Sequence, residues 1–239
     1  MVVDKDNHRI QVFDRDSKFL FKFGSEGTGN GLLNHPRGVV VDQRNNQIVV
    51  ADTWNHRIQI FDEKGTFLRM FGLKGRGDGK FSSPRAVVVD QLGNYVVADE
   101  KNHCVQIFNS HGQFVRKFGS EGKGNGQMNC PFGVGLLSSG DIVVSENNGN
   151  RLQIFDSQGN FIRIMGAGQI SNPRNLFVDS NDNILVADAA NNRIQVFHQN
   201  GNHIKSIETA QSSAPAGVCM DREGRIIVCE VGSNKISIF

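Results

Sequence analysis

A group of short motifs returns in the same order from one end of the chain to the other. A Pro-Arg-Gly-Val motif is followed by Val-Val-Ala-Asp, then by Asn-His-Arg-Ile-Gln-Ile-Phe and by Phe-Leu-x-x-Phe-Gly. A period in the forties made of four short apolar segments is typical of a β-propeller, in which each repeat is one small sheet that buries its faces only against its neighbours. The prolines that mark the copies are 48, 47, 42 and 42 residues apart, at Pro36, Pro84, Pro131, Pro173 and Pro215.

The repeated acidic residue at the end of the second apolar segment occurs six times, which predicts six blades. We therefore expect an all-β, six-bladed propeller with four-stranded antiparallel blades, whose strands we call a, b, c and d in chain order. In the second repeat these strands are 38–41, 48–51, 57–61 and 67–71. The six acidic residues are Asp4, Asp52, Asp99, Glu146, Asp188 and Glu230.

Dividing the whole chain in this way leaves the first blade with only b, c and d and the last with only a, b and c. We expect sequence upstream of Met1 to supply the missing strands, and a weak junction between 2–3 and 236–239. Because the repeat covers the chain, one propeller domain is predicted over 1–239, in a size range that all-β domains reach. Its repeats lie near 1–34, 35–82, 83–129, 130–171, 172–213 and 214–239.

The apolar runs and the cysteine spacing bear on where the chain resides in the cell and on whether it binds a metal. No apolar run approaches the roughly 18 residues that span a bilayer, and the residues that follow Met1 already belong to a repeat, so neither a membrane segment nor a signal peptide is expected. The four cysteines have no zinc-type spacing. We therefore predict a cytoplasmic, monomeric propeller without a metal or another cofactor. The cysteines are Cys104, Cys130, Cys219 and Cys229.

The alternation within a repeat predicts where side chains point. In 57–61 the Ile and Phe side chains are expected to face inward and Gln59 outward. Arg69, in the middle of strand d, suits an exposed outer strand. Asp52 and Arg57 are expected to have a structural role, with the carboxylate accepting N–H groups from the following turn and pairing with the arginine.

The string Asn55-His56-Arg57-Ile58 resembles the NHL repeat, and the linkers 23–27 and 118–122 resemble those of TRIM-NHL proteins, tripartite-motif ubiquitin ligases and relatives of the translational repressor Brat. This resemblance implies a propeller at the C-terminus of a RING-type E3 ubiquitin ligase that binds RNA or protein and represses translation. RING and B-box domains, and the zinc they bind, would lie upstream. The ligase activity would not belong to this chain.

Strand direction places the d-to-a and b-to-c loops on one face, with a formal charge of about +3, and the other loops on a face of about −6. Such polarisation steers an anionic partner to the first face. Arginine pairs with phosphate, and planar side chains stack on unpaired bases. The expected contact residues are Arg37, Arg85, Arg174, Phe132, Trp54, Asn55, His56, Lys101, His103, Asn148, Arg76 and Lys80.

Two functions remain open from the sequence. The first is the binding of single-stranded or hairpin RNA on the positive face, and the second is a protein–protein interaction module that recruits substrates or partners for ubiquitination. An enzyme is not expected, because the innermost strands supply no histidine to hold a metal in the channel.

Overall fold

The structure, a computed structural model, describes residues 1–239. It divides into two compact units, Met1–Lys117 and Phe118–Phe239. Almost all regular structure is β-strand, in six blade sheets of which four have four strands and two have three. None of the helical segments has the length and apolar character needed to cross a membrane.

The first unit contains three blades. The first blade has β1 (Val2–Asp4), β2 (Arg9–Phe13) and β3 (Phe19–Phe23). The second has β4 (Gly38–Asp42), β5 (Gln47–Asp52), β6 (Arg57–Phe61) and β7 (Phe67–Phe71), and the third has β10 (Pro84–Val89), β11 (Tyr95–Asp99), β12 (Cys104–Phe108) and β13 (Phe114–Phe118). Between the second and third blades, β8 (Leu73–Lys74) and β9 (Lys80–Phe81) form a small parallel ladder. Short 3-10 turns join b to c: η1 (Lys5–Asn7), η2 (Thr53–Asn55) and η3 (Glu100–Asn102).

The second unit contains the other three blades. The fourth blade has β14 (Pro131–Leu136), β15 (Ile142–Glu146), β16 (Arg151–Phe155) and β17 (Phe161–Met165). The fifth has β18 (Pro173–Val178), β19 (Ile184–Asp188), β20 (Arg193–Phe197) and β21 (His203–Glu208), with turn η4 (Ala189–Asn191). The sixth has β22 (Pro215–Met220), β23 (Ile226–Glu230) and β24 (Lys235–Ile238).

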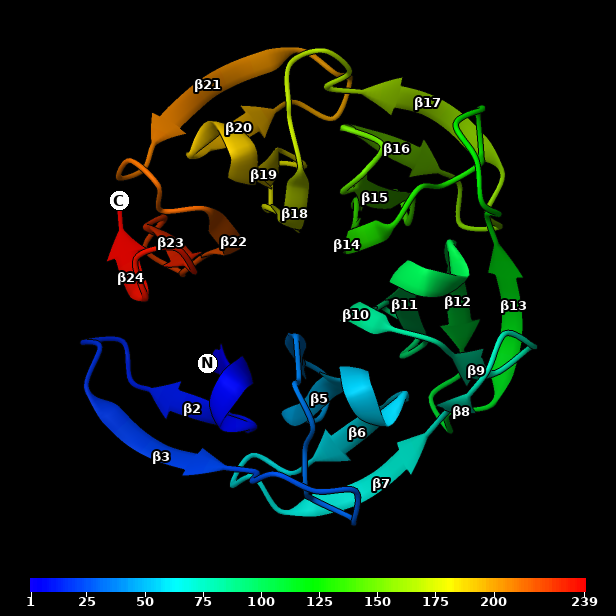
Figure 1. Ribbon diagram of the computed structural model, residues 1–239, viewed down its shortest axis with the longest axis vertical. Helices are drawn as coiled ribbons and strands as arrows, with labels where there is room; N and C mark the ends of the chain where they lie inside the picture. The colour runs from blue at the N-terminus through cyan, green and yellow to red at the C-terminus, as the bar shows by residue number, and fades with distance from the viewer. The chain divides into compact units, whose positions relative to one another are not determined.

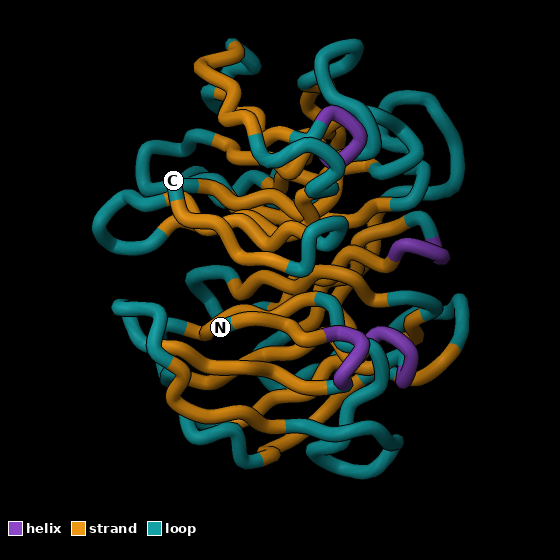
Figure 2. The backbone as a smooth tube through the Cα atoms, turned by 60° about the vertical axis from the view of Figure 1, so that its left-hand side comes forward, coloured by secondary structure: helices purple, strands orange, loops and turns teal.

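The strands of each blade are hydrogen-bonded in chain order, and the resolved pairings are antiparallel (Figure 1). This confirms the predicted fold class, an all-β six-bladed propeller, with a first blade made of b, c and d and a last blade made of a, b and c. The short helical turns appear as purple segments at strand ends in Figure 2.

Apolar side chains fill the space between neighbouring blades. Phe81, which is fully buried, packs on Phe108 of the same blade at a ring distance of 5.2 Å and on Phe71 of the preceding blade at 6.5 Å. Strand d is the exposed strand, as predicted: Leu68 and Met70 of β7 remain 45% and 47% exposed. Arg69 of the same strand is half-buried instead, because its guanidinium donates to the Tyr95 hydroxyl of the third blade at 2.7 Å. The second and third blades therefore bury their facing surfaces against each other, while Leu68 and Met70 of the outer strand stay in contact with water.

The predicted outward orientation of Gln59 is wrong. The side chain is completely buried, and its amide donates to the Leu32 carbonyl at 2.6 Å and to Asp52 Oδ2 at 2.9 Å. In a blade packed on both sides, a polar side chain of strand c faces another blade rather than solvent. Such a group must have hydrogen-bond partners, and here the preceding d-to-a loop provides one.

The structural role of Asp52 is confirmed, but its backbone donor is not in the following turn. Asp52 Oδ1 accepts the main-chain N–H of Asn34 at 2.6 Å, eighteen residues earlier, and Oδ2 pairs with Arg57 Nε at 2.8 Å. The carboxylate therefore joins the end of strand b to the loop that enters its own blade. The same bond recurs from Asn129 to Glu146 and from Ser171 to Asp188.

Candidate nucleic-acid or partner interface

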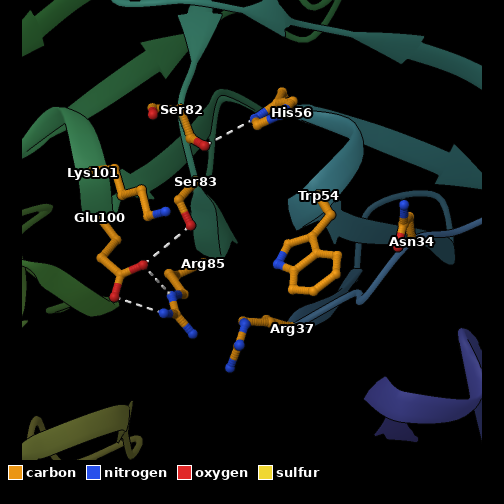
Figure 3. A pocket seen from close by; sticks show the side chains of 9 residues that line it. All are labelled: Asn34, Arg37, Trp54, His56, Ser82, Ser83, Arg85, Glu100 and Lys101. Carbon is orange, nitrogen blue, oxygen red and sulfur yellow. Dashed lines mark hydrogen bonds and ion pairs between the residues drawn. The ribbon is translucent and has the colours of Figure 1, made fainter.

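Loops of the second and third blades enclose a cavity of about 440 Å³, here called the loop pocket (Figure 3). Its walls come from the d-to-a loops and the b-to-c turns of the first unit, as strand direction predicts. The lining residues are Asn34, Arg37, Trp54, His56, Ser82, Ser83, Arg85, Glu100 and Lys101. Five of the predicted contact residues therefore meet there: Arg37, Trp54, His56, Arg85 and Lys101.

Main-chain hydrogen bonds fix the loops that carry these side chains. The N–H of Trp54 donates to the Asn34 carbonyl at 3.1 Å, and the N–H of Glu100 donates to the Ser83 carbonyl at 3.0 Å. Each b-to-c turn is thus attached to the d-to-a loop of its own blade. His56 then connects the two blades, because its Nδ1 lies 2.9 Å from the Ser82 carbonyl.

A buried charge network supports the second-blade side of the loop pocket. The guanidinium of Arg57 donates to three carbonyls of the preceding loop, those of Thr28, Gly29 and Leu32, at 2.7 to 2.9 Å. Asn55, predicted as a contact residue, takes part in this framework through bonds to Asp52 and to the Gly27 carbonyl. These bonds hold the loop carrying Arg37 in place.

The loop pocket carries excess positive charge. Arg85 is paired with Glu100, through Nη2 to Oε1 at 2.6 Å and Nε to Oε2 at 2.8 Å, and Ser83 donates its hydroxyl to the same carboxylate. This pair is formally neutral, so Arg37 and Lys101 leave the lining with a net charge of +2. Both groups of the pair remain only 13% and 14% exposed, so the pair acts as a fixed wall rather than as a mobile surface contact.

Trp54 presents a planar surface at the edge of the loop pocket. It is 55% exposed, and one side of its indole stacks on His35 with ring centres 3.6 Å apart and planes at 23°. His35 was not among the predicted contact residues. Burial lowers the pKa of His35 from its ordinary value, so the ring beneath the indole is neutral at neutral pH.

Some predicted residues do not line the loop pocket. Arg76 is exposed on the connection between β8 and β9, and Lys80 is exposed at the start of β9, where its carbonyl accepts a bond from Gln106. His103 ends turn η3 in the left-handed conformation, with φ 53°. Their proposed contacts with a partner stay predictions.

Three further predicted residues belong to the second unit. Arg174 in β18 donates through Nη1 to the Ala214 carbonyl at 3.3 Å. Asn148 is exposed, and its amide lies 3.2 Å from Cys130 Sγ, while Phe132 is half-buried in β14. Their roles in binding also stay predictions.

The third blade lacks the arginine of its neighbours. Cys104 stands at the position of Arg57, so Asp99, which is completely buried, relies on the N–H groups of Ser82 and Ser83 and on the Asn102 amide. Burial raises the pKa of Asp99 above its ordinary value. It also raises the pKa of the Cys104 thiol to about 12, which makes this thiol unreactive.

Sequence reasoning did not name four lining residues as contacts: Asn34, Ser82, Ser83 and Glu100. Three of them immediately precede or flank the repeated proline, so the register of the repeat contained a signal for them. Glu100 carried a different signal, because its charge is opposite to that of the arginines on the same face. The pairing itself depends on how the turn folds over its own blade.

Comparison with known proteins supports the repeat. The family model described as NHL repeat matches residues 33–61, 81–108 and 171–197, which together make up less than half of the chain. Among curated proteins, the chain is similar to Protein brain tumor of Drosophila melanogaster, with 38% identity over 52 residues. That match covers 22% of this chain and only 5% of the fly protein. The chain thus contains NHL repeats and spans a small part of this relative.

Solved structures share the fold. A catalytically inactive H270A virginiamycin B lyase from Staphylococcus aureus, crystallised with quinupristin, superposes with a TM-score of 0.67 over 97% of this chain and 73% of its own, at 15% identity. A protein of unknown function from Bacteroides caccae gives a TM-score of 0.70 over 93% and 79%, at 13% identity. At these identities the likeness shows the propeller fold alone.

A metal site requires acidic, histidine or cysteine side chains that lie close together. No group of three or more histidine, cysteine, aspartate or glutamate side chains is arranged to hold a metal ion. In the loop pocket, the one carboxylate is paired with Arg85 and His56 is bonded to a carbonyl. The arrangement is one that can bind a ligand by charge, hydrogen bonds and stacking.

Proposed function

We propose that this NHL-type propeller is an RNA-binding module, and that single-stranded or hairpin RNA binds over the loop pocket. The observation that carries the proposal is the position of Trp54, whose exposed indole lies in the same pocket as Arg37 and Lys101. Figure 3 shows the indole facing the cavity, with the Arg37 and Lys101 side chains on different sides of it. An unpaired base can stack on the indole while the flanking phosphates meet the cations.

The dimensions of the site favour a ligand of this size. A cavity of about 440 Å³ lies within the range of roughly 300–1,000 Å³ that small-molecule and cofactor sites occupy. The Ser82 hydroxyl and the amide nitrogen of Asn34 belong to side chains that line the cavity, and such groups read the edges of bases by hydrogen bonding. Because hydrogen bonds already fix the loops around the cavity, little ordering of the chain is required on binding.

A protein partner is the second candidate, and the Arg85–Glu100 pair favours it. A fixed carboxylate repels a polyanion but accepts the N–H donors or cations of a protein. Tryptophan and arginine are also the residues that most often anchor protein interfaces. In that case binding would resist nuclease and depend only weakly on salt.

The wider role is part of the same proposal. The similarity to the fly protein and the NHL repeats support a propeller belonging to a TRIM-type E3 ubiquitin ligase that represses translation in the cytoplasm. Any ligase activity, and the zinc of RING or B-box domains, would then reside elsewhere in the parent protein. The propeller itself would be monomeric, act without catalysis or cofactor, and make no membrane contact.

The test is a binding measurement with a charge-reversal variant. A fluorescein-labelled, single-stranded RNA pool is titrated with wild-type chain and with Arg37→Glu/Lys101→Glu, between about 50 and 200 mM salt. Loss of two phosphate contacts should weaken binding and lower the slope of log K against log salt by roughly 1.4, at 0.7 per phosphate. A hairpin pool is measured in parallel.

The matched control reverses two cations on the opposite face. Lys18 and Lys64 are exposed residues of c-to-d loops in the same unit. Lys18→Glu/Lys64→Glu changes the net charge by the same amount, so it should leave the affinity and the salt slope nearly unchanged. Equal losses in both variants would mean that RNA follows net charge and does not use the loop pocket.

A further inference from the structure

Three aromatic rings from three connections lie against one another beside the loop pocket. His8 follows turn η1, His35 precedes β4, and Trp54 belongs to η2. The His8 and His35 rings form a T-shaped pair, with centres 4.5 Å apart and planes at 89°, and His35 stacks on Trp54 with ring centres 3.6 Å apart. His35 is therefore held between the imidazole of the first blade and the indole that it supports.

A hydrogen bond that requires an unprotonated nitrogen holds His35 in place. The main-chain N–H of His35 donates to Nδ1 of His8 at 3.2 Å. This bond exists only while His8 Nδ1 carries no proton. His35 has φ 44°, in the left-handed region that only a few per cent of residues other than glycine adopt. The bond from His8 therefore helps to maintain an unfavourable backbone conformation.

Other blades make the same bond with a side chain that does not titrate. The N–H of Asn172 donates to Asn150 Oδ1 at 2.7 Å, and the N–H of Ala214 donates to Asn192 Oδ1 at 3.1 Å. Asn150 and Asn192 have the same left-handed conformation as His8, with φ values of 51°, 52° and 53°. An amide oxygen keeps this bond at every pH, whereas His8 makes it dependent on protonation.

The surroundings of His35 favour its neutral form. Its Nδ1 lies 2.9 Å from Asn34 Oδ1, and its Nε2 lies 3.8 Å from Asp6 Oδ1, a carboxylate already paired with Lys5 at 3.1 Å. Burial contributes most to the lowered pKa of His35; positive charge on its neighbours acts in the same direction, and the carboxylate opposes it. The charged or titratable groups that face His35 are His8, Lys5, Arg37 and Asp6.

We propose that His8 and His35 are positioning residues, which fix the indole of Trp54 at the edge of the loop pocket as long as His8 is neutral. Protonation of His8 then releases the indole. A protonated Nδ1 would face the His35 N–H donor to donor, so the bond is replaced by repulsion. His35 then leaves the stack, and the indole loses the support on one side. The effect on ligand binding rests on the proposed function, but the state of Trp54 can be measured without a ligand.

The experiment uses the only tryptophan of the chain. Acrylamide quenching of its fluorescence is measured on the full chain between about pH 8 and pH 5, the range in which histidine changes charge. Release of the ring should increase the quenching constant of the wild type as the pH falls. Because Trp54 is already 55% exposed, the increase can reach about twofold at most.

Two variants distinguish the loss of the His35 ring from beneath Trp54 from general effects of pH on the quenching. His8→Asn copies the acceptor found in the other blades, so quenching should stay low down to pH 5. His35→Asn removes the stacked ring, so quenching should be high throughout. Far-UV circular dichroism confirms that each variant is folded. The proposal is overturned if His8→Asn responds to pH like the wild type, or if His35→Asn matches the wild type at pH 8. Absence of RNA binding would leave this result unaffected.

Discussion

Replacing Arg57 by cysteine would give the second blade the residue that the third blade has at Cys104. Arg57 is 6% exposed, and its guanidinium donates to Asp52 and to three loop carbonyls. Its removal leaves the completely buried Asp52 without a cation. It also takes the arginine donor from the Thr28 and Gly29 carbonyls, whereas the Leu32 carbonyl keeps the Gln59 amide. Removing one partner of a buried pair costs about 3–5 kcal/mol.

The third blade indicates which end of that range applies. Asp99 is buried without an arginine and is held by main-chain and amide donors. Asp52 would likewise retain the Asn34 N–H and the Gln59 amide. We therefore expect a loss of about 3 kcal/mol in the free energy of unfolding. For a chain of this size that corresponds to a midpoint lowered by roughly 6–12 °C.

The reverse exchange should stabilise the third blade. Lys117, whose ammonium pairs with Asp78 at 2.8 Å, stands at the position of Met70 in the second blade. Cys104→Arg/Lys117→Met would therefore recreate the second-blade arrangement around Asp99. We expect a gain of about 1 kcal/mol, smaller than the loss above because the carboxylate already has several donors.

The sign of the pH dependence provides a second check. The pKa of the Asp99 carboxyl is higher in the folded chain than in the unfolded chain, where it is near 4. The contribution of Asp99 to the free energy of unfolding is therefore full below the unfolded-state pKa, and it is lost as the pH rises through the folded-state pKa. An arginine beside Asp99 lowers the folded pKa. The gain from the double variant should therefore be larger at pH 7 than at pH 4.5.

Urea unfolding followed by circular dichroism, under reducing conditions, measures the loss for Arg57→Cys, the gain for Cys104→Arg/Lys117→Met and the dependence of that gain on pH. Arg76→Cys is the control, because Arg76 is exposed and the same substitution there should stay within about 0.5 kcal/mol of the wild type. A loss below about 1 kcal/mol for Arg57→Cys would refute the role given to the buried pair. An increase in the free energy of unfolding of the double variant that is greater at pH 4.5 than at pH 7 would refute the role given to the charge of Asp99.

Three other outcomes can be checked. Trp54→Ala should weaken RNA binding by about 1–3 kcal/mol, the contribution of one stacked base, with little change in the melting midpoint; equal affinity in a filter-binding assay would contradict this. Glu100→Gln should increase RNA affinity and its salt dependence, because Arg85 loses its partner carboxylate; a decrease measured by anisotropy would favour the protein-partner function. Gly72→Val should lower stability by more than about 1 kcal/mol in urea titration, because φ is +96° and a Cβ would lie 2.5 Å from the Phe81 ring.

Much of the fold could be predicted from the repeat because the period and the apolar segments are local properties. In the second repeat, strands c and d have the predicted bounds, whereas strand a is longer by one residue at one end and strand b by one residue at each end. The exposed d strand and the two incomplete blades also appear in the structure. Gln59 was misplaced because alternation assumes one solvated face. Its recurrence at the same position of strand c in five of the six blades indicated a shared bond instead, while the sixth blade has Ser237 there; the five are Gln11, Gln59, Gln106, Gln153 and Gln195.

The loop pocket could be predicted only in part. Strand direction alone places Arg37, Trp54 and Lys101 on one face, and the structure brings them to one cavity. Which loops converge depends on the packing of adjacent blades, which short-range patterns do not encode. Arg76 does not line the cavity, although its loop is as basic as any other on that face. It belongs to the connection between β8 and β9, whose ends are fixed by the pairing of these two strands.

The pairing of Arg85 with Glu100 shows why counting charges by face is insufficient. Both residues contribute to the face total, yet the bidentate bond fixes them as one neutral element. The excess formal charge of the lining is then that of Arg37, beside the indole of Trp54 (Figure 3), and of Lys101, next to Glu100 in the chain. We therefore expect the attraction of a polyanion to this cavity to depend on Arg37 and Lys101 more than on Arg85. The net charge of the face, which counts Arg85 and Glu100 separately, does not show this difference between the arginines.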